Sequence, residues 1–79
     1  MIQDQVRAFV TNNFYVAEPD ALQNADSLLD SGVIDSTGVL EIIAFIEETF
    51  GLAIEDAEIL PENLDSIDRI SNFVVRKMK

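Results

Sequence analysis

The sequence contains no cysteine and no histidine, and only five basic residues, three glycines and two prolines. Without cysteine there is no disulfide framework, no thiolate metal ligand and no thiol nucleophile. No apolar run approaches the ~20 residues that a membrane-spanning helix needs, and the first residues lack the basic and apolar regions of a secretory signal. These absences predict a cytoplasmic protein with no membrane span.

The charges are strongly unequal, since fifteen acidic residues against five basic ones give a formal net charge of −10. No base stands between positions 7 and 69, whereas fourteen acids lie between positions 18 and 68. A nucleic-acid-binding surface needs the opposite sign to neutralise phosphates, so this class is excluded. An acidic surface suits basic protein partners and divalent cations instead. The five bases are Arg7, Arg69, Arg76, Lys77 and Lys79.

The 79 residues, of which 48% are hydrophobic, suit one domain, residues 1–79, with a single modest core. Apolar residues recur at helical spacing in three segments, which predicts helices over residues 2–15, from position 36 to about position 50, and for about twelve residues after Asp65, the expected cap. A short helix is expected over residues 55–60, ended by Pro61. Because no alternating strand pattern appears, we predict an all-α fold: a small four-helix bundle with three main helices and one short helix. The predicted core side chains are Ile2, Val6, Phe9 and Val10, then Val39, Ile42, Ile43, Ile46 and Phe50, then Ile67, Ile70, Phe73 and Val74.

Residues 17–35 form a long loop between the first two main helices, which in so small a domain is either functional or partly structured. Pro19-Asp20 predicts a short helical turn, and Asp30-Ser31-Gly32 is turn chemistry. Four apolar residues of this loop are expected to fold back on the bundle: Leu28, Leu29, Val33 and Ile34.

Asp35 and Ser36 open the second predicted helix, and Ser36 is the most suggestive position for chemistry. A serine nucleophile needs a base and a group that orients the base, but the chain has no histidine, no lysine before Lys77 and no G-x-S-x-G elbow. We therefore expect no catalytic residue and no enzyme.

A phosphoester on Ser36 would instead meet free N–H groups and the positive end of the helix dipole. Asp35 offers a cap, and an oxygen ligand for a Mg²⁺ brought by a phosphate-transferring partner. The plain alternative is that the pair only caps the helix.

The stretch "GVIDS", followed by "EIIAFIEETFG", resembles the acyl carrier protein family, which includes peptidyl and D-alanyl carrier proteins. The resemblance covers nearly the whole chain: helix, long loop, "DSGVIDS", acidic helix, short helix and last helix. It implies that Ser36 receives 4′-phosphopantetheine from coenzyme A, whose thiol then carries an acyl or aminoacyl group as a thioester. It also implies a cavity for an acyl chain between the second helix and residues 54–64. Thr37 departs from the Leu or Met of many members, and Gly38 is similar to some D-alanyl carrier proteins.

The partners implied by the resemblance are a phosphopantetheinyl transferase and enzymes that load and transfer the cargo through basic surfaces. Glu41 and Glu48 lie about two turns apart on one side of the second helix, near Ser36, so this side is the expected docking face. We expect no resident metal site and a monomer. The alternative reading is an acidic helical adaptor that binds a basic protein without a prosthetic group. The residues expected to contact partners are Thr37, Leu40, Glu41, Ala44, Glu47 and Glu48, with Glu55, Asp56 and Glu58 as a second acidic edge.

Overall fold

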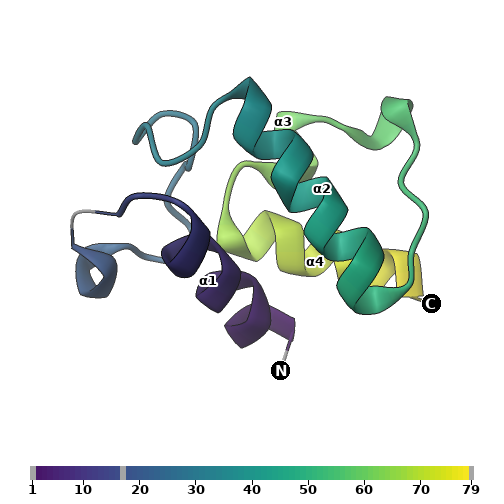
Figure 1. Ribbon diagram of the computed structural model, residues 1–79, viewed down its shortest axis with the longest axis horizontal. Coiled ribbons are helices and arrows are strands. Elements are labelled where there is room, and N and C mark those ends of the chain that lie inside the picture. The colour runs from purple at the N-terminus through teal and green to yellow at the C-terminus, as the bar shows by residue number, and fades with distance from the viewer. Residues whose placement is uncertain (1, 17, 79) are drawn as a thin grey trace.

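The computed structural model describes residues 2–16 and 18–78, and within these residues the fold is helical with no strand (Figure 1). Helix α2 crosses the molecule in front of α4, and α1 lies to one side of these two helices (Figure 1). The predicted all-α bundle of three main helices and one short helix is confirmed. The helices are α1 (Ile2–Asn13), α2 (Ser36–Phe50), α3 (Pro61–Leu64) and α4 (Ile67–Met78), and single 3-10 turns form at Pro19–Ala21 and Asp56–Glu58.

The core is built from the predicted apolar stripes of the three main helices. The stripe of α4 is fully buried, and Ile42, Ile43 and Ile46 form the buried side of α2. Four residues of the predicted stripes are only partly buried and pack against the edge of this core: Ile2 and Phe9 of α1, and Val39 and Phe50 of α2. The buried apolar residues are Val6, Val10, Leu22, Leu28, Ile34, Ile42, Ile43, Ile46, Leu64, Ile67, Ile70, Phe73 and Val74.

The long loop is anchored to the bundle at several points. Leu28 and Ile34 are buried as predicted, whereas Leu29 is more exposed than predicted. The guanidinium of Arg7 on α1 donates hydrogen bonds to Asn24 Oδ1 (2.8 Å) and to the backbone oxygens of Leu22 (2.6 Å) and Pro19 (2.7 Å). The loop is therefore structured, and α1 fixes its first half to the bundle.

Several predicted helix boundaries are wrong. Helix α1 ends at Asn13 and not at position 15, and only the 3-10 turn Asp56–Glu58 forms where a short helix is predicted over residues 55–60. Pro61 begins α3 instead of ending the preceding helix, because a missing N–H costs nothing at the first helical position. Ser66, not Asp65, caps α4: its buried Oγ accepts a hydrogen bond from the N–H of Arg69 (3.0 Å). The carboxylate of Asp65 turns the other way and accepts bonds from Ser27 Oγ (2.7 Å) and from the N–H of Leu29 (2.9 Å). Asp65 therefore ties the long loop to the junction between α3 and α4.

Candidate functional site

Ser36 is the first residue of α2 and is exposed. Asp35 before it has an extended backbone, and its Oδ1 accepts a hydrogen bond from the N–H of Gly38 at 2.8 Å. This bond satisfies one of the amide groups that the first helical turn leaves unpaired. The capping role predicted for Asp35 is confirmed. The Ser36 hydroxyl has no hydrogen-bond partner among the described residues.

An apolar pocket of about 300 Å³ opens beside Ser36. It lies between the first turns of α2 and the segment that leads into α3, where a cavity was expected. Leu29, which lies outside the buried core, forms one wall of this pocket. Among the lining residues only Ser36 is polar. The pocket is lined by Leu29, Ser36, Val39, Leu40, Ile59, Leu60, Pro61 and Leu64.

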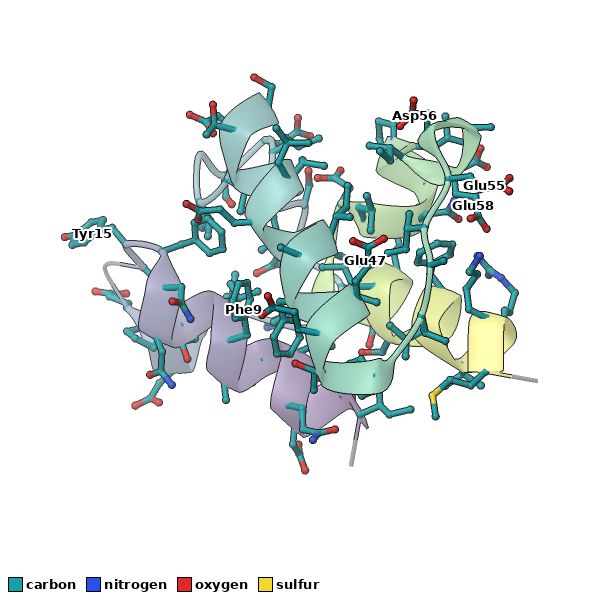
Figure 2. All side chains as sticks on the ribbon, turned by 45° about the vertical axis from the view of Figure 1, so that its right-hand side comes forward. Phe9, Tyr15, Glu47, Glu55, Asp56 and Glu58 are labelled. Carbon is teal, nitrogen blue, oxygen red and sulfur yellow. The ribbon has the colours of Figure 1, made fainter. Side chains whose placement is uncertain are left out.

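The outer face of α2 carries the expected acidic side chains. Glu41, Ala44 and Glu48 are exposed and border a shallow hollow between α1 and α2. Phe9 of α1 and Phe45 of α2 also line this hollow, and their rings stack with centroids 4.2 Å apart and planes 17° from parallel. Figure 2 shows Phe9 in the space between the two helices. The helical spacing predicted the carboxylates on this face, but it did not predict the aromatic pair beside them.

Thr37 and Leu40 complete the exposed side of α2. Thr37 belongs to the first helical turn, next to Ser36. Leu40 has 61% of its surface exposed, which is high for so apolar a side chain, and it lies at the edge of the Ser36 pocket. The apolar and acidic parts of the expected docking face therefore lie on the same helix as Ser36.

Glu47 differs from its neighbours on α2 because its carboxylate is used within the chain. It is half-buried, and its Oε2 accepts a hydrogen bond from the N–H of Ile54 at 3.0 Å. Figure 2 shows Glu47 pointing toward the segment that follows α2. Glu47 therefore fixes this segment to α2.

In the second acidic edge, as on α2, one carboxylate makes an ion pair or hydrogen bond within the chain while its neighbours are exposed. Glu55 and Asp56 are exposed, and they gather with Glu58 at the turn of the segment before α3 (Figure 2). Glu58 forms an ion pair with Lys77 of α4, at 2.8 Å from Nζ to Oε1. The hydrogen bond from the N–H of Glu55, together with the bond and positive charge of Lys77, holds the pKa of Glu58 below its ordinary value.

The basic side chains that the structure describes are all engaged with other parts of the chain. Arg7 binds the long loop, Arg69 donates to the backbone oxygen of Glu62, and Arg76 donates to Asn63 Oδ1. The Lys77–Glu58 contact is the one ion pair within residues 2–16 and 18–78. No described base pairs with the carboxylates of α2, so this face keeps its negative charge.

The described residues contain no group of three or more carboxylate, histidine or cysteine side chains arranged to hold a metal ion. Within the same part of the chain, no helix combines the length and the apolar character that crossing a membrane requires.

Comparison with known proteins gives two matches. The family described as "phosphopantetheine attachment site" matches residues 4–74, which extend from α1 into α4. The D-alanyl carrier protein of Abiotrophia defectiva is 33% identical to this chain over 52 residues. These residues cover 66% of this chain and 66% of that relative, so slightly less than two thirds of the relative's length is matched.

Proposed function

This chain belongs to the phosphopantetheine attachment family, and we propose that Ser36 is the residue that carries its covalently bound 4′-phosphopantetheine. The observation that carries the proposal is a comparison of the five serine hydroxyls. Ser27 donates to Asp65, Ser31 to the backbone oxygen of Leu28, and Ser71 to that of Ile67. Ser66 is buried and caps α4. Only the Ser36 hydroxyl is exposed without a partner among the described residues, and so it is open to a transferase.

The surroundings of Ser36 fit the phosphate of this group. The hydroxyl stands at the start of a fifteen-residue helix, where unpaired N–H groups and the positive end of the helix dipole favour an anion. Asp35 occupies only the N–H of Gly38, so the N–H groups of Ser36 and Thr37 stay available. When bound, the group supplies the thiol that a cysteine-free chain lacks.

We propose that residues 1–79 act as one carrier domain that presents an acyl or aminoacyl group to partner enzymes and performs no catalysis itself. Two observations bear on the cargo. The name of the relative supports an aminoacyl group such as D-alanine. The pocket beside Ser36, which apolar side chains line almost completely, supports an acyl chain, since it would shield such a chain from water. We favour the acyl chain because the pocket is a property of this chain itself.

The exposed face of α2 supports the docking of basic partners. A transferase or loading enzyme that reaches Ser36 must also contact the nearby face, which carries Glu41, Glu48 and the exposed Leu40. Carboxylates without an internal partner attract basic surfaces, and this raises mainly the association rate and the specificity. We assign Glu47 and Glu58 a smaller part in docking because both are used within the chain.

The test of attachment is incubation of the protein with coenzyme A, Mg²⁺ and a broad-specificity phosphopantetheinyl transferase, followed by intact mass measurement. One phosphopantetheine per chain is expected for the wild type and for Ser31→Ala, and none for Ser36→Ala with unchanged helical circular dichroism. Ser31 is the matched control because it is also an exposed serine after an aspartate. Addition to Ser36→Ala would show that another residue is modified, and no addition to the wild type would favour an adaptor without a prosthetic group.

The test of docking is the double variant Glu41→Lys with Glu48→Lys. We expect it to lower kcat/KM of the transferase and to weaken its dependence on salt. The control reverses Asp4 and Glu18, which gives the same change in net charge; Asp4 borders a separate groove between α1 and α4. Equal losses for the two double variants would show that only net charge matters.

A further inference from the structure

The outer wall of the Ser36 pocket is made by Ile59 and Leu60, at the end of a segment with little packing of its own. None of the residues 51–60 is buried. Leu52, Ile54 and Ile59 are only partly buried and pack against the surface of the core. Segments with few buried apolar contacts open locally at low free-energy cost. The position of this wall therefore depends on polar contacts.

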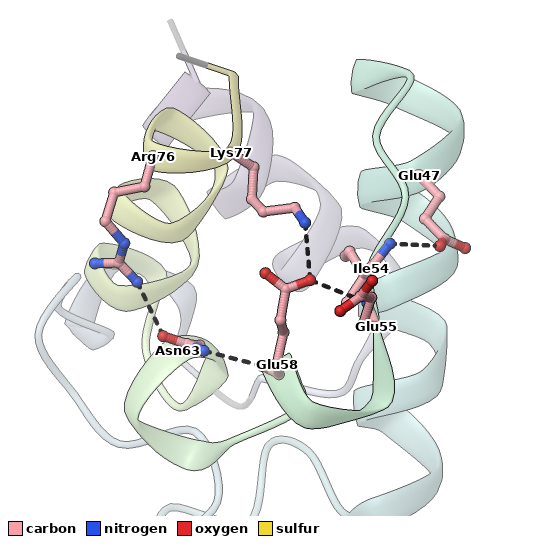
Figure 3. Close-up of polar contacts among 7 residues, drawn as sticks. All are labelled: Glu47, Ile54, Glu55, Glu58, Asn63, Arg76 and Lys77. Atoms are coloured by element: carbon pink, nitrogen blue, oxygen red, sulfur yellow. Dashed lines mark hydrogen bonds and ion pairs between the residues drawn. The ribbon is translucent and has the colours of Figure 1, made fainter.

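Those polar contacts come from both sides of the segment, as Figure 3 shows. On the side of α2, Glu47 holds the N–H of Ile54 (3.0 Å). On the side of α4, Lys77 Nζ lies 2.8 Å from Glu58 Oε1, which also accepts the N–H of Glu55 at 3.0 Å. The residue after Glu58 is already part of the pocket wall, so the Lys77–Glu58 ion pair anchors the segment where the wall begins.

Asn63 extends this anchor into α3. Its Nδ2 donates to the backbone oxygen of Glu58 (2.9 Å), and its Oδ1 accepts a bond from Arg76 (2.9 Å). Lys77 and Glu58 have side-chain exposures of 24% and 28%, so both are partly screened from solvent. An ion pair in such a place is weakened less by salt than a fully exposed one.

We propose that the Lys77–Glu58 ion pair holds the outer wall of the Ser36 pocket closed and so limits the length of the acyl chain that the pocket accepts. This inference rests on the proposed function, in which the pocket shields an acyl group carried on Ser36. Lys77, which is forty-one positions after Ser36 in the sequence, acts as a positioning residue through Glu58. Without its ammonium group the wall moves outward more often, and longer chains fit.

The first measurement needs no acyl chain. The N–H of Ile59 donates to the backbone oxygen of Asp56 and that of Leu60 to Glu58, so both report on the wall in amide hydrogen exchange. Lys77→Met keeps an unbranched apolar stem and removes the charge. From the usual strength of such pairs, this variant should exchange at Ile59 and Leu60 roughly two- to fivefold faster, while the amides of α2 keep their rates. Unchanged exchange at the two wall residues overturns the proposal.

The second measurement is a chain-length profile. Wild type and variants are loaded from acyl-coenzyme A thioesters of increasing length with a broad-specificity transferase, and the Tm of each is compared with that of the unacylated form. A chain that binds the folded protein raises Tm, so the profile has its maximum at the length that fills the pocket. We expect Lys77→Met and Glu58→Gln each to move this maximum to longer chains. Because they break one interaction, the double variant should move it no further.

Two variants serve as matched controls for charge. Lys77→Arg keeps the positive charge and should keep the wild-type profile. Arg69→Met removes a base from the same helix, whose contact is the backbone oxygen of Glu62 and not the segment 51–60. A maximum that stays in place in Lys77→Met, or moves equally in Arg69→Met, overturns the proposal. If the arm is attached but no chain length stabilises the wild type, the chain-length limit is refuted while attachment to Ser36 stands.

Discussion

Gly38 is buried near the start of α2, and we expect Gly38→Ala to destabilise the protein although alanine favours helices. A Cβ at this position would lie 2.9 Å from Phe14 Cε1 and 3.2 Å from Ile34 Cβ. Both distances are shorter than the optimal contact of about 3.5–4.0 Å between carbon atoms. The rings of Phe14 and Phe9 pack in a T-shaped contact with centroids 5.9 Å apart, and Ile34 is buried in the core. Neither neighbour therefore yields freely.

The size of the effect follows from two opposing contributions. Alanine is favoured over glycine by about 0.8–1.0 kcal/mol in a helix interior, and by less in a first turn. Inserting a methyl group into a filled site costs about 1–3 kcal/mol. We expect a net loss of about 1 kcal/mol in the free energy of unfolding. Urea titration followed by far-UV circular dichroism measures this loss as a lower midpoint with an unchanged slope.

The background Phe14→Leu tests the reason for the loss. It removes the ring atom that the new methyl group would meet first and leaves the contact with Ile34. Gly38→Ala should therefore cost less in this background, with a coupling of about 0.5 kcal/mol or more. Equal costs in the two backgrounds, or a Gly38→Ala protein as stable as the wild type, would refute the steric argument.

Three further predictions concern the charged residues. Asp65→Ala removes the acceptor of two hydrogen bonds from the long loop and should lower the free energy of unfolding by about 1–3 kcal/mol in urea titration, while Asp30→Ala at the exposed turn should change it little. Glu58→Gln should be less stable than the wild type at neutral pH, because a carboxylate with a depressed pKa stabilises the fold only while it is ionised. The difference in stability should vanish as the pH falls through the lowered pKa of Glu58. A difference that persists in strong acid would contradict this. Added NaCl, and millimolar Mg²⁺ more strongly, should raise the Tm by screening the fifteen acids, and a flat titration would mean that their repulsion is too dispersed to matter.

The boundaries of α2 could be predicted from the sequence because their signals are local. Asp35 caps the first turn, as the sequence predicted. Gly51 has a φ of 67°, the left-handed conformation that glycine adopts most easily, and its N–H donates to the backbone oxygen of Glu47. Each signal acts within four residues of the helix end, so no knowledge of the rest of the fold was needed.

The roles of Asp65 and Glu47 could not be predicted because their partners are set by the path of the chain. Asp65 precedes a helix and offers a carboxylate, as a cap does. The long loop, however, passes close enough for the N–H of Leu29 to donate to that carboxylate. The sequence predicts Glu47 only as a partner contact on the second helix, because the N–H of Ile54 reaches its carboxylate only when the chain turns back after Gly51. The Ser36 pocket has the same origin, since its lining comes from α2, α3, the long loop and the segment before α3.

The described basic side chains bind parts of the chain other than the acidic face of α2, and this bears on the proposed docking. The described bases near the chain ends do not pair with the carboxylates of α2. Arg7 donates to the long loop, Arg69 and Arg76 donate to α3, and Lys77 pairs with Glu58 in the segment before it. Each of these cations ties its helix to another segment of the chain. Glu41 and Glu48 of α2 therefore have no basic partner among the described residues, which supports the docking face proposed above. A base introduced at Thr37 or Ala44, close to those carboxylates, would relieve their repulsion and raise Tm at low salt. It should also slow the transferase, so that stability and docking change in opposite directions, whereas a face without a docking role would change in stability alone.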